Sequence, residues 1–173
     1  MDLCQYESGK FVTDLSLDSF GNWLTVKVKP VAMRYVLPLD IDAKPGDNLL
    51  SKLTLKTTAT ATLNSEGNVY CTPEQLFDNG FEFPRLNYSK VNGRPYSVFY
   101  GTGAEKDQGF GSTSLKFNLN TREVKKWSPG NPEHIVGEPV FIERPGAKTE
   151  GMMALFLFRY QSFVEQRKII WLS

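Results

Sequence analysis

The chain has 173 residues, of which 40% are hydrophobic, and its 20 Lys and Arg residues nearly balance its 19 Asp and Glu residues. That length allows one domain with a sizeable core, and the balanced charge gives no reason to expect nucleic acid as a partner. The longest apolar run, residues 152–158, is far shorter than the roughly 20 residues that span a bilayer, and residues 1–10 lack the pattern of a secretory signal. We therefore expect a cytoplasmic protein.

The first strand signals are alternations of apolar and polar residues with a period of two, the pattern of a half-buried strand. Residues 24–29 show this alternation, and residues 53–63 repeat it over a longer stretch. The second stretch places five apolar side chains on one face, namely Leu53, Leu55, Ala59, Ala61 and Leu63. Turn residues at 64–67 lead into residues 68–71, and this order predicts a hairpin.

Two turn signals follow. Thr72 and Pro73 are typical of the N-cap and first position of a helix, so residues 72–75 predict a short helical turn. Asn92-Gly93 lies between two apolar stretches and predicts a tight β-hairpin turn.

A further pair of strands, residues 114–119 and 122–127, is predicted to turn at Asn120-Thr121. No long helical pattern separates any of these short strands. Their spacing therefore indicates an all-β sandwich, barrel or propeller.

Few residues have the arrangement of a catalytic site. The single histidine, His134, lies between Pro and Gly residues, where we interpret it as a solvated loop side chain, because a metal site needs several converging donors. Cys4 and Cys71 form neither a disulfide framework nor a zinc pattern and are interpreted as buried or incidental thiols in a reducing compartment. In that compartment the sequon at Asn87 is expected to be unused.

Two other segments carry no clear chemistry. Residues 101–111 are rich in glycine, but the spacing does not fit a dinucleotide loop and a strand follows, so a mobile loop is predicted. Arg122, Lys125 and Lys126 flank apolar residues in a pattern typical of the solvated face of a strand pair.

Two carboxylates stand in unusual surroundings. Glu82 lies between two phenylalanines in FEFP, and Glu138 precedes an apolar strand in GEPVF. Alternation turns Glu82 away from both phenylalanines, which is consistent with an outward-pointing strand residue. The alternative is a carboxylate in an aromatic setting, which must be paired or hydrogen-bonded to be tolerated. Periodicity leaves both interpretations open.

Several motifs resemble, in sequence order, the C-terminal half of the animal carotenoid cleavage oxygenases, a family that includes the retinoid isomerase of the visual cycle. The motifs are RYVLPLDID, TTATA, FEFPRLNY, NGRPYSVFYGTG, SLKFNLNTREVKKW and GEPVFIERPGA. The resemblance covers roughly residues 1–150, and FEFPRLNY and GEPVFIERPGA are its most specific parts.

The resemblance implies an all-β fold, a seven-bladed β-propeller of which this chain would form roughly two to three blades. In that family four histidines hold one Fe(II), which activates O2 beside an apolar tunnel and cleaves a double bond of a carotenoid or retinoid-type polyene. Glu82 and Glu138 match glutamates that hydrogen-bond the ligand histidines and orient them. Phe83 matches an aromatic residue near the substrate cavity. Substrate uptake implies peripheral contact with a membrane, and no specific protein partner is evident.

The chain also departs from the family pattern. None of the four iron-binding histidines falls within it, and His134 matches none of them. Met1 would be an internal methionine of a longer protein, and residues 151–173 are predicted to be a divergent, loosely collapsed tail from an alternative exon or a gene-model error. We therefore divide the chain into a partial oxygenase domain, residues 1–150, and this tail.

The combined prediction is a portion of an iron-dependent carotenoid oxygenase that retains no iron and is inactive alone. An alternative is a non-catalytic truncated isoform that binds apolar isoprenoids or a protein partner. A generic β-barrel ligand binder is a third hypothesis, and it leaves GEPVFIERPGA unexplained.

Overall fold

A computed structural model describes residues 1–10, 12, 30–78, 80–104, 111–130, 136–148 and 150, and the backbone of residues 153–159 and 166–172. Within these ranges nearly all regular structure is β, and the named helix, α3 (Tyr88–Val91), has four residues. The described part of the chain thus confirms the all-β prediction. Residues 24–29 and His134 lie outside the described ranges. Among the described residues, no helix is long and apolar enough to cross a membrane.

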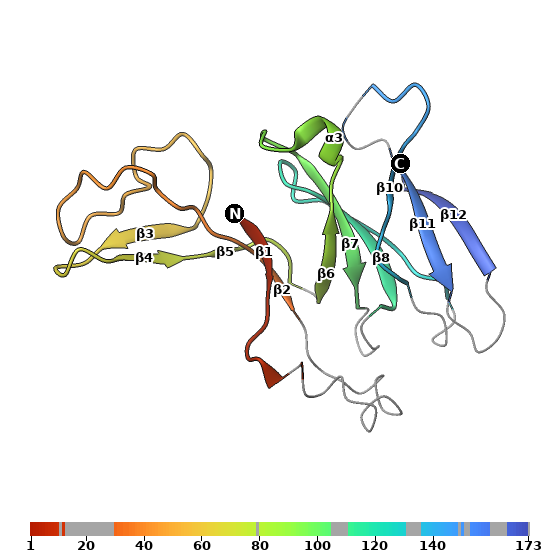
Figure 1. The fold of residues 1–173 in the computed structure, drawn as a ribbon, viewed down its shortest axis with the longest axis horizontal. Helices are drawn as coiled ribbons and strands as arrows, with labels where there is room; N and C mark the ends of the chain where they lie inside the picture. Colours follow the sequence, from red (N-terminus) through yellow and green to blue (C-terminus); the bar gives the residue numbers. More distant parts are fainter. Residues whose placement is uncertain are drawn as a thin grey trace.

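The central sheet has four strands in the order β6-β7-β8-β9 (Figure 1). These are β6 (Phe81–Arg85), β7 (Val98–Gly103), β8 (Thr113–Asn118) and β9 (Val124–Trp127). Each strand pairs antiparallel with the next one along the chain. The predicted hairpin at Asn120-Thr121 is confirmed as the β8–β9 connection.

The other described strands form three smaller sheets. One has the order β1-β2-β5, built from β1 (Asp2–Gln5), β2 (Val31–Arg34) and β5 (Glu74–Gln75). The second is the predicted hairpin of β3 (Thr60–Leu63) and β4 (Val69–Thr72). The third has the order β10-β11-β12, with β10 (Phe141–Glu143), β11 (Met153–Arg159) and β12 (Gln166–Leu172). The β3–β4 hairpin and the β10–β12 sheet lie at opposite ends of the molecule (Figure 1).

The predicted helical turn at residues 72–75 is wrong. Thr72 ends β4 opposite Thr60, and Glu74 begins β5 opposite Arg34. Pro73 lies between these two strands, a position that needs no backbone N–H donor. Pairing with two different sheets therefore outweighs the local N-cap signal of Thr72 and Pro73.

The strand predicted for residues 53–63 is shorter than expected. Only its last four residues form β3, while Leu53 and Leu55 lie before it and remain 48% and 47% exposed. The Asn92-Gly93 signal also differs from the outcome. β6 and β7 do pair antiparallel, but α3 occupies the connection, and Gly93 has a φ of 68° in the turn that follows the helix.

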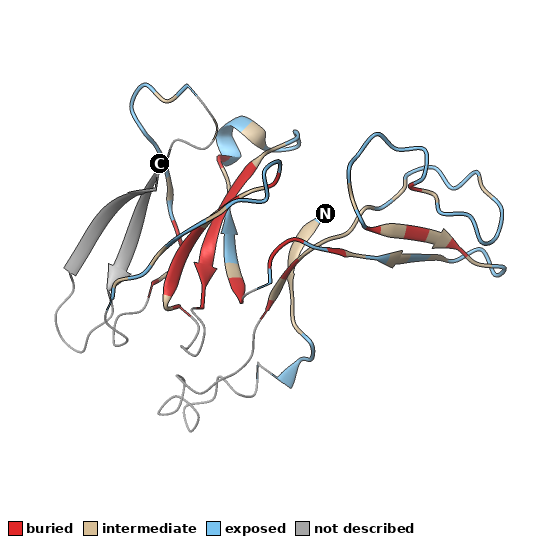
Figure 2. Cartoon of the chain, turned by 180° about the vertical axis from the view of Figure 1, so that it is seen from behind, coloured by how far each residue is buried: buried red, intermediate tan, exposed pale blue. Residues whose placement is uncertain are grey.

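Buried residues lie along the strands of the central sheet and also at the β3–β4 hairpin (Figure 2), and apolar clusters pack on both faces of the central sheet. One face packs against the β1-β2-β5 side of the molecule, through a cluster that contains Ala32, Leu76, Phe77, Phe81, Phe99, Leu115, Phe117 and Leu119. On the opposite face Val98 and Tyr100 pack with Val136, and Trp127 and Phe141 lie against them. Both faces of the central sheet therefore carry buried apolar side chains.

The segment after residue 150 was expected to collapse loosely, but its described residues form two strands. β11 pairs with β10 over three residues and with β12 over seven. The apolar run of β11 has no period-two alternation, so the sequence carried no strand signal there. Backbone pairing with β10 and β12 supplies the order that the side-chain pattern does not indicate.

Candidate functional site

Glu82 lies at a local irregularity of β6. The register between β6 and β7 shifts after Glu82, which stands opposite Thr102. Phe83 has a φ of 52°, and Pro84 follows it. Pro has no N–H to give to a ladder, so a bulge is one of the few places in a strand where it is tolerated. As a result Phe83 leaves the alternation of the strand, and its side chain is 42% exposed.

The carboxylate of Glu82 accepts several hydrogen bonds. The hydroxyl of Tyr6 donates to Oε1, and the backbone N–H of Phe83 donates to Oε2 at 3.1 Å. The thiol of Cys4, on β1, also donates a hydrogen bond to this carboxylate. Glu82 is half-buried and its carboxylate is hydrogen-bonded, while its register with Thr102 turns it away from Phe81, so features of both interpretations are present and its role stays a prediction.

These contacts change the acidity of both donors. Burial and, after it, the charge of Glu82 and the hydrogen bond raise the pKa of the Cys4 thiol to about 12. Burial, the hydrogen bond to Glu82 and the charge of Glu82 also raise the pKa of the Tyr6 hydroxyl above its ordinary value. Both groups therefore stay protonated at neutral pH and act as donors to Glu82.

Glu138 lies on the extended segment that leads into β10. Its exposed carboxylate accepts a hydrogen bond from Nη2 of Arg85, the last residue of β6, and the two form an ion pair. The residues around Glu138 are fixed to the central sheet. The N–H of Val136 donates to the carbonyl of Gly111 at 2.6 Å, and the side chain of Pro139 is fully buried.

Thr102 connects the segments that carry the two carboxylates. It is the register partner of Glu82, and its Oγ1 donates to the carbonyl oxygen of Gly137 at 2.7 Å, one residue before Glu138. Together with the Arg85–Glu138 pair, this contact brings Glu82, Phe83 and Glu138 to one part of the molecule, at β6 and the entry to β10. Whether they orient metal ligands or border a substrate stays a prediction.

Sequence reasoning missed Tyr6, Arg85 and Thr102, because each acts through a contact between distant parts of the chain, Tyr6 with Glu82, Arg85 with Glu138 and Thr102 with the carbonyl of Gly137. It also assigned residues 101–111 to a mobile loop, and for the first three residues this is wrong. Gly101, Thr102 and Gly103 belong to β7 and are buried. A Cβ on Gly101 would lie 2.1 Å from the Phe81 ring, so glycine there allows β6 to pack closely on β7.

These residues do not by themselves fit an iron site. The sequence contains one histidine, whereas the family pattern described above uses four. In the described ranges no group of three or more His, Cys, Asp or Glu side chains could hold a metal ion. Both carboxylates also have other partners, Glu82 with Tyr6 and Cys4 and Glu138 with Arg85.

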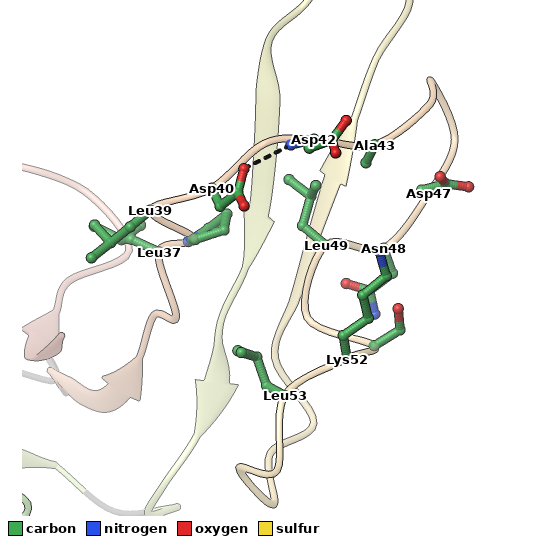
Figure 3. Close-up of a pocket in the computed structure, with 12 residues that line it drawn as sticks. Leu37, Leu39, Asp40, Asp42, Ala43, Asp47, Asn48, Leu49, Lys52 and Leu53 are labelled. Atoms are coloured by element: carbon green, nitrogen blue, oxygen red, sulfur yellow. Dashed lines mark hydrogen bonds between the residues drawn. The ribbon is translucent and has the colours of Figure 1, made fainter.

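A cavity of about 550 Å³ lies elsewhere, beside the β3–β4 hairpin (Figure 3). It lies between residues 37–43 and 47–53, and its walls combine leucines with the carboxylates of Asp40, Asp42 and Asp47. The N–H of Asp42 donates to Oδ1 of Asp40 at 3.1 Å, so that carboxylate helps to form the local turn. Neither Glu82, Phe83 nor Glu138 lines this cavity.

Solved structures show which class of fold this is. The crystal structure of the cobalt-substituted apocarotenoid oxygenase of Synechocystis has a TM-score of 0.50 with this chain, at 22% identity, over 84% of this chain and 30% of that one. A mutant of the same oxygenase gives the same TM-score at 23% identity. The chain is thus part of a β-propeller of the carotenoid oxygenase type, as predicted.

Residues 1–171 match the family described as retinal pigment epithelial membrane protein, and the chain belongs to this family of carotenoid oxygenases. This finding confirms the predicted family. The match continues past residue 150 and includes β11 and all of β12 except Leu172. The division of the chain at residue 150 and the origin of the segment after it stay predictions.

Curated relatives are carotenoid-cleaving dioxygenases. Human β,β-carotene 15,15′-dioxygenase is 36% identical over 156 residues, which are 86% of this chain and 27% of the human protein. The mouse enzyme of that name is 37% identical over 123 residues, 70% of this chain and 20% of the mouse protein. The mitochondrial carotenoid-cleaving dioxygenase of Pongo abelii is 30% identical over 165 residues, 87% of this chain and 29% of that protein. The chain therefore spans less than a third of the length of these relatives.

Proposed function

We propose that this chain is a portion of an iron-dependent carotenoid dioxygenase, and that Glu82 and Glu138 orient histidine ligands of the iron. The substrate class is a carotenoid or retinoid-type polyene. Cleavage of one carbon–carbon double bond by one O2 gives two carbonyl products, so the atoms balance without a further reductant. Family membership and the dioxygenase names of the human and mouse relatives support this reaction class.

The observation that carries the proposal is the juxtaposition of the two glutamates. Glu82 stands opposite Thr102, and Thr102 is hydrogen-bonded to the residue before Glu138. A carboxylate that accepts the second N–H of a ligand imidazole fixes its tautomer and orientation. Phe83 lies beside Glu82 with a partly exposed ring, which suits a residue that borders an apolar substrate.

The same proposal makes the chain inactive alone. Orienting carboxylates do not retain a ferrous ion without the imidazoles that bind it, and this sequence has a single histidine. The imidazoles would come from polypeptide outside these residues. The purified chain, supplied with Fe(II) and a carotenoid, is expected to hold no stoichiometric iron by metal analysis and to cause no O2-dependent bleaching. One tightly held iron per chain would overturn this expectation.

The second candidate, a non-catalytic isoform that binds apolar isoprenoids, is separated by the same assay. Binding without cleavage shifts the carotenoid absorption spectrum but releases no carbonyl product. Both faces of the central sheet are already covered by packed side chains, so among the described residues the sheet offers no open apolar face on which to enclose a ligand. This favours a portion of an oxygenase over a protein that binds an isoprenoid by itself.

The orienting role requires a test in a longer product. Sequencing the transcript upstream of the codon for Met1 shows whether the reading frame continues into a histidine-containing segment. In that product Glu82→Gln and Glu138→Gln are each expected to weaken iron binding roughly 10- to 100-fold in a chelator competition. Glu143→Gln is the matched control, because Glu143 is a nearby glutamate that pairs with Lys90. Equal effects of all three changes would contradict the role.

A further inference from the structure

Thr102 lies in a row of side chains that crosses the whole central sheet. Its register partners are Glu82 on β6 and Ser114 on β8, and Ser114 is in turn opposite Trp127 on β9. Register partners in antiparallel strands point to the same face of the sheet. This face carries the packing with Val136 and Phe141, so the row faces the segment that leads to β10.

Two hydroxyls in this row differ in what they contact. Thr102 and Ser114 are both 0% exposed. Oγ1 of Thr102 donates to the carbonyl of Gly137, whereas Oγ of Ser114 has no hydrogen-bond partner among the described residues. The two positions are therefore matched in burial and face but not in contact.

The Thr102 contact acts on the backbone of Glu138. The carbonyl of Gly137 and the N–H of Glu138 belong to one planar peptide unit, so fixing the carbonyl also fixes the plane from which Glu138 continues. We propose that Thr102 is a positioning residue, which holds the Gly137–Glu138 peptide at a set place relative to Glu82. The contact between Thr102 and Gly137 does not depend on what Glu138 does. Only the functional importance of that contact rests on the proposed role of Glu138.

The proposal explains why threonine stands between two glycines. Gly101 and Gly103 allow close approach of neighbouring groups, since a Cβ on either would lie within 2.7 Å of a side chain of Phe81 or Leu115. Thr102 is therefore the one residue of this three-residue stretch with a side chain. Its hydroxyl lies on the same face of the sheet as Glu82 and donates to the carbonyl of Gly137. The glycines set the strand spacing, and the threonine fixes the neighbouring segment.

The test compares three variants of the full 173-residue chain. Thr102→Val keeps the shape but removes the donor, Thr102→Ser keeps the donor, and Ser114→Ala removes the buried hydroxyl that has no partner. The reporter is the amide hydrogen of Val136, which is bonded to the Gly111 carbonyl and exchanges when the segment opens. Exchange is read by NMR or mass spectrometry, with β8 amides as the reference for global unfolding.

In Thr102→Val, exchange at Val136 is expected to rise about tenfold relative to the β8 amides, because one buried hydrogen bond is lost. Thr102→Ser is expected to restore the slow exchange, and Ser114→Ala to leave it unchanged. The ¹³C resonance of the Glu138 carboxyl should move in Thr102→Val and return in Thr102→Ser. Equal acceleration of all amides, or no change at Val136, would overturn the proposal.

This result is independent of the iron and cleavage assays. If exchange and the Glu138 resonance do not respond, Thr102 is not a positioning residue, whatever the chain catalyses. If they respond as expected while the chelator competition shows no role for Glu138, the positioning stands and the proposed orienting function fails.

Discussion

At the scale of single residues, burial and Glu82 together raise the pKa of the Cys4 thiol. Burial is the larger cause of the raised pKa, and the charge and hydrogen bond of Glu82 add to it. Because the thiolate is the nucleophilic form of cysteine, Cys4 is expected to be unreactive at neutral pH. Cys4 is a free, half-buried cysteine, which fits its interpretation as a buried or incidental thiol.

The pKa of the Cys4 thiol can be measured from the pH dependence of its alkylation rate. In a Cys71→Ser background, the rate at which iodoacetamide modifies Cys4 should rise with pH toward a midpoint near pH 12. Glu82→Gln removes the negative charge but not the burial, so the midpoint should fall while staying above the ordinary value of 9.0. Glu143→Gln, which changes a glutamate paired with Lys90, should not move it. If Glu82→Gln does not change the midpoint, Glu82 does not influence the Cys4 thiol.

The same shift has a consequence for stability with a definite sign. The folded chain holds the Cys4 proton more tightly than the unfolded chain does. This contribution to stability is fully present below about pH 9 and is lost as the pH rises toward about 12.

The sequence predicted part of this site. The FEFP and GEP motifs, which are local in sequence, indicated Glu82, Phe83 and Glu138 as candidates, and their roles stay predictions. Tyr6 and Thr102 reach Glu82 and Gly137 through contacts that only the folded chain creates. A single-sequence pattern carries no signal for such long-range pairing, which explains why these partners were missed.

At the scale of the secondary-structure elements, β7 contains two glycines that remove the usual sequence signal of a strand. Its C-terminal residues Gly101 and Gly103 provide no apolar side chain, so the stretch was assigned to a loop. The structure pairs them with Leu115 and Thr113 on β8. Because the glycines have no side chains, those of neighbouring strands can pack closely against the backbone of β7. This packing stabilises the strand although glycine has a low β-propensity.

Gly101→Ala tests this explanation. The new Cβ would lie 2.1 Å from Cε2 of Phe81 and 2.8 Å from the carbonyl oxygen of Glu82, so the free energy of unfolding should fall by about 1–3 kcal/mol. Gly9→Ala is the control, because nothing lies within 4 Å of its added Cβ. Urea denaturation of both variants checks the difference. Equal stabilities would mean that β6 and β7 are not so closely packed.

At the scale of the whole molecule, the buried carboxylate of Glu74 joins three parts of the chain. It lies on β5, accepts a hydrogen bond from Thr57 Oγ1 at 2.6 Å, and forms an ion pair with Arg122 in the β8–β9 connection. Arg122 has a φ of 62°, an uncommon backbone conformation for a residue with a side chain. Arg122 is exposed, as predicted for a solvated face, and its guanidinium also pairs with Glu74 on another sheet.

Arg122→Ala should destabilise the chain by about 2–3 kcal/mol, because Glu74 keeps its charge at 7% side-chain exposure while Arg122 is 42% exposed. Adding Glu74→Gln should recover part of the loss by removing that charge. Lys90→Ala breaks an exposed pair and should cost less than about 1 kcal/mol. Urea denaturation of the three variants measures these differences. A loss for Arg122→Ala no larger than for Lys90→Ala would contradict the inter-sheet role.

The overall class was predictable because it depends on repeated features of the sequence. Short alternating strands at regular spacing indicated an all-β fold, and ordered motifs indicated the family, which matches residues 1–171. The C-terminal strands were not predicted, since β11 is apolar up to Arg159 without alternation and its order comes from pairing with β10 and β12.

Glu150, the last residue of the predicted domain, also contributes to the central sheet. Its carboxylate accepts hydrogen bonds from the N–H and hydroxyl of Ser97, at 2.9 and 2.6 Å, and from the N–H of Val98, at 3.3 Å. Trimming the polypeptide just before this residue would leave the first amides of β7 without their acceptor. An expression boundary chosen only from recognisable motifs would therefore weaken the entrance to the same strand that bears Thr102.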